Sequence, residues 1–209
     1  MKSNHPPYGK DFLGHVATGR FSDGKIISDF AASILGIKDT VPRFLDPKLS
    51  DEDIRTGTIP SGDRSIVVAG LPPIGCLPLQ ITVKLHLLRT CVDQQNSDAK
   101  SYNQKLASQI PRLESSLPES KIIYADIYTP LSDMDNPHKY GLMETRRGCC
   151  GTGLLEAGPL CSALSPVCPT SSTFLFWDGI HPTESAYRYL SEALEQQIGS
   201  QLLQKVSNH

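Results

Sequence analysis

The sequence contains no long hydrophobic segment. No apolar run approaches the roughly 20 residues that a membrane-spanning helix needs. Residues 1–8 contain neither the apolar core nor the small-residue cleavage site of an export signal. We therefore expect no transmembrane segment and no signal peptide within this chain.

The sequence also lacks an excess of charge of either sign. Its 20 Lys and Arg residues are balanced by 22 Asp and Glu residues, giving a net charge of -2. Proteins that bind nucleic acid usually carry a basic surface, so no nucleic acid partner is predicted. A length of 209 residues, with 39% hydrophobic and 20% charged residues, fits one globular domain.

Cysteines are few, but four of the six lie close together. Cys149, Cys150, Cys161 and Cys168 fall in one segment rich in Gly and Pro, while Cys76 and Cys91 flank an earlier loop. This distribution favours disulfides that hold long loops in an oxidising compartment, with the connectivity open. Free buried thiols and a zinc site are the alternatives, although the sequence has no C-x-x-C pair.

No metal or cofactor motif stands out elsewhere. Gly151-Thr152-Gly153 is too short to cradle a phosphate and fits a loop held by its neighbouring cysteines. We predict no cofactor and no bound metal.

Helix and strand patterns alternate along the chain, which predicts an α/β fold. Residues 65–70 form a continuous apolar run followed by Pro72-Pro73, as in a buried parallel strand that ends in a rigid turn. Residues 121–128 predict a second such strand. Between them, apolar residues from Ala99 to Leu117 recur at three- and four-residue steps, so we expect a long helix that Pro111 kinks or breaks.

Two further helices are predicted. The first follows Ser22-Asp23-Gly24, with Ser22 or Asp23 as its N-cap, and ends before Gly36. The last begins near Thr183. Its inner face is predicted to carry Tyr187, Leu190, Leu194, Ile198 and Leu202.

The candidate catalytic residues lie just before this last helix. Asp178 precedes His181 by three residues, so its carboxylate can fold back onto the imidazole, fix its tautomer and stabilise its protonated form. A helix-start device is one alternative, because a carboxylate suits the positive end of the helix that follows. A metal site is a weaker alternative, since a third ligand is absent.

Four ordered motifs carry a resemblance that covers nearly the whole chain. It resembles the plant GDSL-type esterase/lipases of the SGNH hydrolase superfamily. The motifs are Pro6-Pro7-Tyr8-Gly9 with Thr18-Gly19-Arg20-Phe21-Ser22-Asp23-Gly24, Gly70-Leu71-Pro72-Pro73-Ile74-Gly75-Cys76-Leu77-Pro78, Cys149-Cys150-Gly151-Thr152-Gly153, and Phe176-Trp177-Asp178-Gly179-Ile180-His181-Pro182-Thr183.

The resemblance implies a fold and an activity. The expected fold is a three-layer α/β/α, flavodoxin-like domain with a parallel sheet, spanning residues 1–209. The expected activity is carboxylic ester hydrolysis by a Ser-His-Asp triad, in which Asp178 and His181 supply the acid/base part. The substrate would be a small-molecule or lipid ester, and the protein would be secreted. Acyl length and oligomeric state are left open.

The nucleophile that such enzymes need is missing. The family places it in a Gly-Asp-Ser segment ahead of the Pro-Pro-Tyr-Gly element, and two further blocks supply a Gly N–H and an Asn to the oxyanion hole. This chain starts at that element, and the segment that should hold the other two blocks looks deleted near residues 57–61. Gly62-Asp63 is followed by Arg64, and no G-x-S-x-G elbow exists.

Two functional hypotheses follow. Either these residues are an incomplete gene model, splice form or fragment of a secreted ester hydrolase, or they are a product without catalysis. Such a product would be a pseudoenzyme that keeps binding surfaces or a non-functional remnant. Ser22 and Ser61 are the only stand-in nucleophiles that we consider, and both are weak candidates. We therefore expect an inactive chain and an incomplete sheet. Its strand at residues 65–71 would keep an unpaired inner edge, which predicts marginal stability or association.

Overall fold

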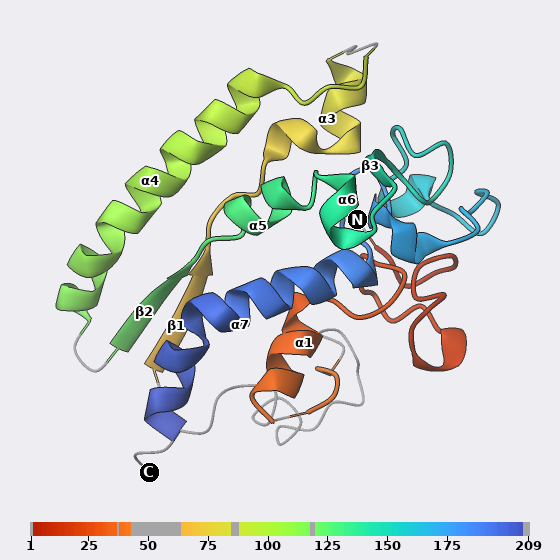
Figure 1. Ribbon diagram of the computed structural model, residues 1–209. Coiled ribbons are helices and arrows are strands. Elements are labelled where there is room, and N and C mark those ends of the chain that lie inside the picture. The colour runs from red at the N-terminus through yellow and green to blue at the C-terminus, as the bar shows by residue number, and fades with distance from the viewer. Residues whose placement is uncertain (1, 37, 43–63, 85–87, 118–119, 207–209) are drawn as a thin grey trace.

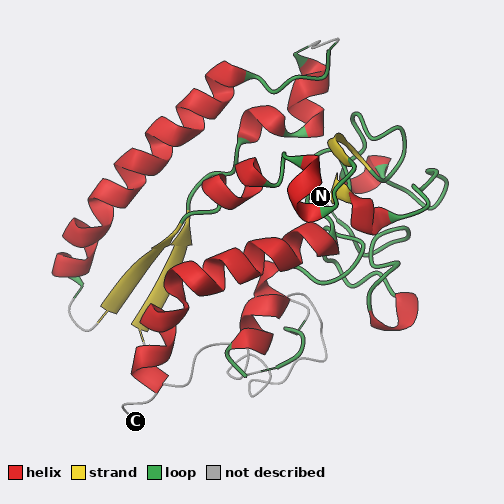
Figure 2. Cartoon of the chain, in the orientation of Figure 1, coloured by secondary structure: helices red, strands yellow, loops and turns green. Residues whose placement is uncertain are grey.

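The computed structural model describes residues 2–36, 38–42, 64–84, 88–117 and 120–206. Helices are the dominant elements, and the segment between the third and fourth strands is mostly loop (Figures 1 and 2). In chain order the elements are α1 (Ile27–Ile34), β1 (Arg64–Ala69), α3 (Pro78–Val83), α4 (Asp93–Ser116), β2 (Ser120–Ala125), α5 (Tyr128–Asp133), α6 (Pro137–Tyr140), β3 (Glu144–Gly148), β4 (Phe174–Phe176) and α7 (Glu184–Val206).

The two predicted strands form a parallel pair joined by the predicted crossover helix. β1 pairs with β2 so that Val67 lies opposite Ile123 and Ala69 lies opposite Ala125. The α4 helix runs along one side of this pair and α7 crosses on the other (Figure 1). Ile123 and Ala125 are buried against Ile198 of α7. Helices on both sides of a parallel sheet confirm the α/β prediction.

The sheet is incomplete. Among the described residues, β1 pairs with β2 alone, and the chain forms two sheets of two strands each. Ile66 is 48% exposed and Val67 is 44% exposed, although an apolar strand inside a parallel sheet is normally covered on both faces. Within the described ranges, the expected free edge of this strand is therefore present, while marginal stability remains a prediction.

The second sheet was not predicted. β3 pairs with β4 in parallel, with an irregularity between Glu144 and Gly148. Neither strand has a recognisable pattern, because β3 is largely polar and β4 has three residues. Leu175 and Phe176 of β4 nevertheless enter the main core, where they pack with Leu131, Leu142 and Leu190.

Three details of the helices differ from prediction. α4 continues through Pro111 without a break; Pro111 is exposed, so water can bind the carbonyl that the missing N–H leaves free. The apolar face of α4 is also less covered than expected, because Tyr102 and Leu113 are about half exposed. The N-cap of α1 is Ile26 rather than Ser22 or Asp23, and the Asp29 carboxylate accepts the Ile26 N–H instead. The start of α7 agrees with prediction.

Candidate active site

Asp178 and His181 lie in a tight turn that follows β4. The Trp177 N–H donates to the His181 carbonyl at 2.8 Å, and the Thr183 N–H donates to the Leu175 carbonyl at 3.1 Å. These bonds fold the chain back on itself and close the turn at its base. The turn is thereby anchored in the core through Leu175, which is nearly fully buried.

Inside the turn the carboxylate faces the imidazole. Asp178 accepts the N–H groups of Ile180 and His181, each at 2.8 Å, and its two oxygens lie 3.0 and 2.9 Å from His181 Nδ1. Asp178 is fully buried, whereas the His181 side chain is 25% exposed. With Nδ1 held by the carboxylate, Nε2 is the nitrogen left to exchange a proton with a substrate or nucleophile.

Two aromatic residues of the N-terminal segment complete the surroundings of the pair. The Tyr8 hydroxyl donates to Asp178 Oδ2 at 2.7 Å and accepts the Gly158 N–H at 2.8 Å. Burial and the charge of Asp178 raise the pKa of Tyr8, so the phenol remains a donor. The Phe21 ring stacks on the His181 ring, with 4.5 Å between centroids. Both aromatics restrict how the pair can move.

The cysteine-rich segment also supports the turn, and it packs in the same buried cluster as Tyr8 and Trp177. The disulfides are Cys76–Cys91, Cys149–Cys168 and Cys150–Cys161, which confirms the disulfide prediction and leaves no thiolate for zinc. Cys149 and Cys150 donate their N–H groups to the carbonyls of Phe176 and Trp177, immediately before Asp178. This segment therefore fixes the strand that leads into the turn.

Close backbone contact at Gly148 adds a further constraint. A Cβ atom at this position would lie 2.7 Å from the Asp178 backbone.

Glu156 supports the same region, since its backbone carbonyl accepts the Gly179 N–H at 2.6 Å. Burial alone would raise the pKa of the Glu156 carboxyl, but hydrogen bonds from Thr152 and Leu154 lower it to about 2.

The chain matches the GDSL-like Lipase/Acylhydrolase family over residues 52–194. It is 37% identical to two Arabidopsis thaliana proteins, GDSL esterase/lipase At2g30220 and GDSL esterase/lipase At1g06990. Each comparison covers 298 positions, 95% of this chain and 83% of the relative. The chain belongs to the GDSL esterase/lipase family.

Membership of this family makes the chain a GDSL-type ester hydrolase by descent, with small-molecule esters as the class of substrate. It also confirms the resemblance to plant GDSL esterase/lipases. Within the described ranges, no helix is both long and apolar enough to cross a membrane.

The helix-start alternative for Asp178 is wrong. The carboxylate at the beginning of α7 belongs to Asp23, whose Oδ1 accepts the Glu184 N–H at 2.7 Å, and the Thr183 hydroxyl accepts the Ala186 N–H. Asp178 instead bonds to residues of its own turn and to Tyr8. The Asp178 carboxylate is therefore free to serve His181.

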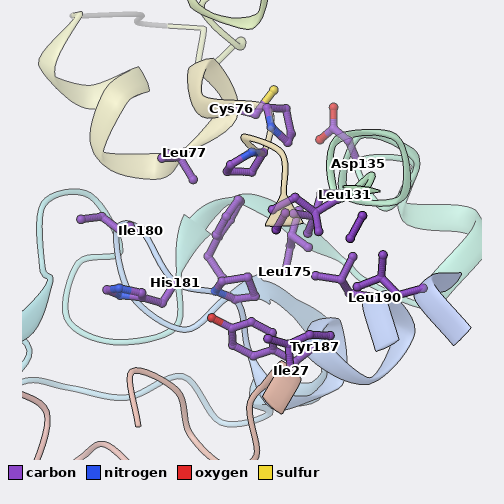
Figure 3. A pocket seen from close by; sticks show the side chains of 18 of the residues that line it. Ile27, Cys76, Leu77, Leu131, Asp135, Leu175, Ile180, His181, Tyr187 and Leu190 are labelled. Atoms are coloured by element: carbon purple, nitrogen blue, oxygen red, sulfur yellow. The ribbon is translucent and has the colours of Figure 1, made fainter. Parts of the chain in front are cut away.

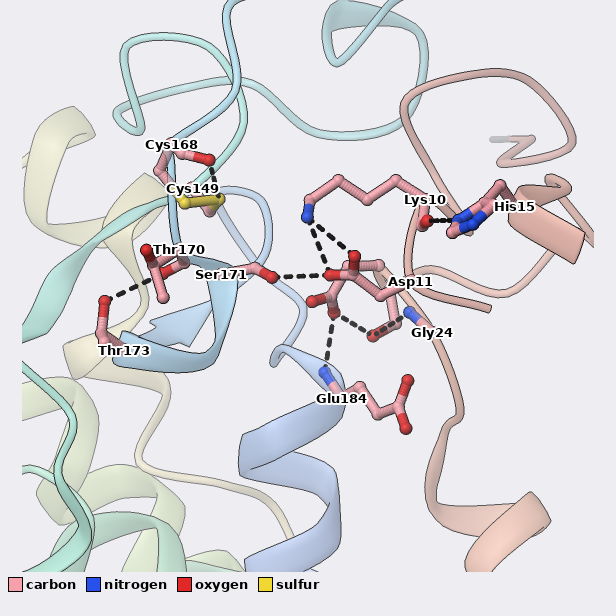
Figure 4. Close-up of polar contacts among 12 residues, drawn as sticks. Lys10, Asp11, His15, Gly24, Cys149, Cys168, Thr170, Ser171, Thr173 and Glu184 are labelled. Atoms are coloured by element: carbon pink, nitrogen blue, oxygen red, sulfur yellow. Dashed lines mark hydrogen bonds and ion pairs between the residues drawn. A yellow bond between two sulfur atoms is a disulfide. The ribbon is translucent and has the colours of Figure 1, made fainter. Parts of the chain in front are cut away.

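Asp23 belongs to a small polar cluster beside the N-terminus of α7, where it accepts the Glu184 N–H. Figure 4 shows Asp11, Ser171 and Glu184 gathered in this cluster. The Ser22 hydroxyl donates to Asp23 at 3.0 Å, and the Ser171 hydroxyl donates to Asp11 at 2.7 Å. Burial raises the pKa of the Asp23 carboxyl to about 6. The cluster attaches the N-terminal segment to the helix that follows His181.

The stand-in nucleophiles gain no support. The Ser22 hydroxyl is bonded to Asp23 rather than to His181, and Ser61 lies outside the described residues. Among the described residues, the hydrogen bonds of the His181 ring run to Asp178 alone. Spacing in the sequence predicts no role for Tyr8 and Phe21, although both lie in motifs that carry the family resemblance.

Proposed function

We propose that Asp178 and His181 are the acid/base half of a GDSL ester hydrolase, and that this chain is catalytically inactive by itself. The observation that carries the proposal is the His181 ring, whose Nδ1 lies 2.9 Å from the buried Asp178 carboxylate while no described serine reaches its Nε2. His181 would act as general base through Nε2. Asp178 would orient the ring and stabilise the imidazolium.

The absence of a nucleophile and of the oxyanion-hole donors explains why Asp178 and His181 alone would accelerate ester hydrolysis only slightly. General-base catalysis contributes about 10²- to 10⁴-fold, and each oxyanion donor contributes roughly 10²- to 10³-fold more. Without a nucleophile, His181 could only activate water, and without the donors the tetrahedral oxyanion would be stabilised by solvent. We therefore expect the hydrolytic rate of the chain to lie near background.

An absent internal segment is a part of this proposal. The alignments extend over 298 positions, which exceeds the 209 residues of this chain, so they cross positions of the relatives that have no counterpart here. We place the absent segment near residues 57–61, which lie outside the described residues. Directly after this point β1 pairs, among the residues that the structure describes, with β2 alone, which supports that placement.

A fluorophosphonate probe tests the absence of a nucleophile. Such probes label a serine only where a neighbouring base activates it. Intact-mass measurement of the purified chain should show no adduct, while a family member with a complete triad should be labelled under the same conditions. An adduct that is lost in His181→Ala would contradict the proposal.

The role of the pair can be tested without turnover. Nitrogen-15 NMR of the imidazole should report the tautomer with the proton on Nδ1 in the wild type. Asp178→Asn should alter that signal, because the buried carboxylate no longer accepts the Nδ1 proton. An unchanged His181 signal in a folded Asp178→Asn variant would remove the orienting role.

The proposal also includes the location of the protein, which the disulfides suggest is an oxidising compartment. All three disulfides involve loops around the site, and such bonds persist in secreted proteins. We propose that the protein is extracellular. Secretion would be tested by expressing the tagged coding sequence in plant cells and assaying the apoplastic fluid.

A further inference from the structure

A short stretch of the cysteine-rich segment exposes only apolar side chains. In residues 159–166, here called the apolar tip, the exposed residues are Pro159, Leu160, Ala163, Leu164 and Pro166. Leu164 is 95% exposed and Leu160 is 64% exposed. A single exposed leucine is ordinary on a protein surface, but exposed apolar residues grouped without a polar one among them indicate an interaction site.

The polar groups of the apolar tip are bonded within the segment. The Ser165 hydroxyl donates to the Leu160 carbonyl at 3.2 Å and accepts the Ser162 N–H at 3.0 Å. The Ser162 hydroxyl accepts the Leu164 N–H at 3.3 Å, and the Ser165 N–H donates to the Ser162 carbonyl at 2.9 Å. The N–H groups of Leu160 and Cys161 donate to carbonyls just before the tip. Because these groups already have partners, the tip can leave water at a low cost in broken hydrogen bonds.

The segment around the apolar tip carries a single charge. Glu156 is the one charged residue in residues 148–173. Its carboxylate accepts the N–H groups of Thr152, Leu154 and Leu155, at 2.9, 3.0 and 3.2 Å. The charge therefore has partners inside the protein, and the tip itself has neither an anion nor a cation to keep in water.

The apolar tip is fixed next to the candidate site. The disulfides Cys150–Cys161 and Cys149–Cys168 hold it. The Gly158 N–H, just before the tip, donates to the same Tyr8 hydroxyl that bonds to Asp178. Little conformational freedom is left for the tip to lose when it binds a partner.

The tip occupies a different place from the apolar cavity beside the candidate site. That cavity has a volume of about 400 Å³ and lies next to His181 (Figure 3). Residues 159–166, all of which the structure describes, contribute no wall to it. In Figure 1 the loops of the cysteine-rich segment lie on the side of the molecule away from α4. The tip is therefore a surface feature and no part of the cavity.

We propose that the apolar tip docks the protein on the surface of a zwitterionic phospholipid membrane, with Leu160 and Leu164 inserted among the acyl chains just below the headgroups. Apolar side chains that enter this zone bind through the area that they bury. Basic residues would add attraction to anionic lipids, and the tip has none. The chemistry of the tip thus selects a neutral lipid surface.

A protein partner fits the apolar tip less well. A standard protein interface uses about 20–30 residues a side and roughly ten hydrogen bonds. The tip spans residues 159–166, and the hydroxyls of both of its serines are already bonded within it. A lipid surface needs no matching hydrogen bonds and adapts to any protruding apolar side chain.

Docking goes beyond ester hydrolysis and does not rest on the proposed function. A chain that hydrolyses no ester can still bind a membrane, and an active chain can fail to bind one. Failure of either proposal therefore leaves the other unaffected, because binding and hydrolysis are measured separately.

Flotation of the purified 209-residue chain with phosphatidylcholine vesicles measures docking. The wild type should float with the vesicles. Replacing part of the lipid by anionic phosphatidylglycerol should not strengthen binding, because the tip carries no cation. Absence of flotation with phosphatidylcholine, or flotation that requires the anionic lipid, would overturn the proposal.

Substitutions to aspartate locate the contact. Leu160→Asp and Leu164→Asp should each lower the partition coefficient about tenfold or more, because the burial of one leucine side chain contributes at least about that factor. Leu113→Asp is the control, since it adds the same charge at a half-exposed leucine of α4. Its partition coefficient should stay within about twofold of the wild type. Circular dichroism checks that each variant is folded, and equal losses in all three would overturn the proposal.

A tryptophan at the tip reports insertion directly. Trp177 is the single tryptophan of the sequence and is fully buried, so its emission gives a constant background. The emission of Leu164→Trp should shift to shorter wavelength when vesicles are added, and brominated phosphatidylcholine should quench it. Leu113→Trp should show neither effect. An unchanged Leu164→Trp spectrum would overturn the insertion of the tip.

Sedimentation velocity without lipid tests a second copy of the chain as the partner. The wild type and Leu164→Asp should sediment alike. A wild-type dimer that Leu164→Asp converts to a monomer would overturn the proposal in favour of self-association through the tip.

Discussion

The Tyr8 hydroxyl and the Asp178 carboxylate are 170 residues apart in sequence and 2.7 Å apart in space. Through this bond the N-terminal segment reaches the candidate catalytic pair. The same hydroxyl accepts the Gly158 N–H, so one buried phenol joins the N-terminal segment, the cysteine-rich segment and the turn that holds Asp178 and His181.

Tyr8→Phe removes that hydroxyl and keeps the ring. The Gly158 N–H loses its partner inside the protein, so we expect a loss of about 1–3 kcal/mol in the free energy of unfolding. Chemical denaturation measures the loss. Tyr102→Phe is the control, because Tyr102 is half exposed and should change stability by less than about 0.5 kcal/mol. Equal free energies of unfolding for the two variants would show that the hydrogen bonds of the Tyr8 hydroxyl make no net contribution to stability.

Gly148→Ala should disturb the turn that holds Asp178 and His181. The added Cβ would lie 2.7 Å from the Asp178 backbone, so the turn or β3 must move. We expect a loss of about 1–3 kcal/mol in unfolding free energy, together with a shifted His181 NMR signal. Gly199→Ala in α7 has space for its methyl group and should instead stabilise by about 0.5–1 kcal/mol. A folded Gly148→Ala variant with an unchanged His181 signal would contradict the role of Gly148.

Asp23 should make stability depend on pH. Because burial raises the pKa of its carboxyl to about 6 from an ordinary value near 4, the folded state binds the proton more tightly than the unfolded state. The contribution of Asp23 to the free energy of unfolding is complete below the pKa that this carboxyl has in the unfolded state. It is lost as the pH rises through about 6. The Asp23→Asn variant has no carboxyl to titrate at this position, so this loss of stability with rising pH does not occur. Between pH 4 and pH 7 the variant should gain roughly 2–3 kcal/mol on the wild type, as measured by urea unfolding.

Asp11→Asn is the comparison within the same cluster, because a hydrogen bond with Asp11 is one of the causes that raise the pKa of Asp23. Burial alone would raise the pKa of Asp11, but Ser171 and Lys10 lower it, so its contribution to stability has the opposite dependence on pH. The Asp11 variant should not reproduce the gain of Asp23→Asn. Parallel stability curves for the wild type and Asp23→Asn would contradict the raised pKa.

Arg20 and Asp29 form a buried ion pair with two hydrogen bonds, at 2.7 and 2.6 Å. Arg20→Ala would leave a buried carboxylate without its partner, so we expect a loss of about 3–5 kcal/mol. The exposed Arg188 provides the comparison, since Arg188→Ala should cost less than about 1 kcal/mol. Thermal unfolding distinguishes the two. A small loss in Arg20→Ala would mean that water reaches Asp29 readily.

The sequence predicts local elements of this protein well and long-range contacts poorly. The apolar runs of β1 and β2, the crossover helix α4 and the start of α7 follow from periodicity, because each pattern lies within one segment. The β3–β4 pairing could not be predicted, since its short and polar strands are stabilised by the disulfide segment and the core.

The same contrast between local and long-range contacts applies to the candidate site. Asp178 and His181 are three residues apart, and their contact follows from spacing alone. Tyr8 and Phe21 reach the pair from the distant N-terminal segment, and the role of Asp23 at α7 depends on the same long-range packing. A single sequence can mark such residues by motif membership but cannot assign the contact.

Hydrolysis of p-nitrophenyl butyrate by the purified 209-residue chain tests the central claim most directly. The wild type and His181→Ala, both checked for folding by circular dichroism, should hydrolyse the ester at the same rate, close to that of buffer. A wild-type rate well above buffer that disappears in a folded His181→Ala variant would contradict the account, because a nucleophile or an activated water would then be present.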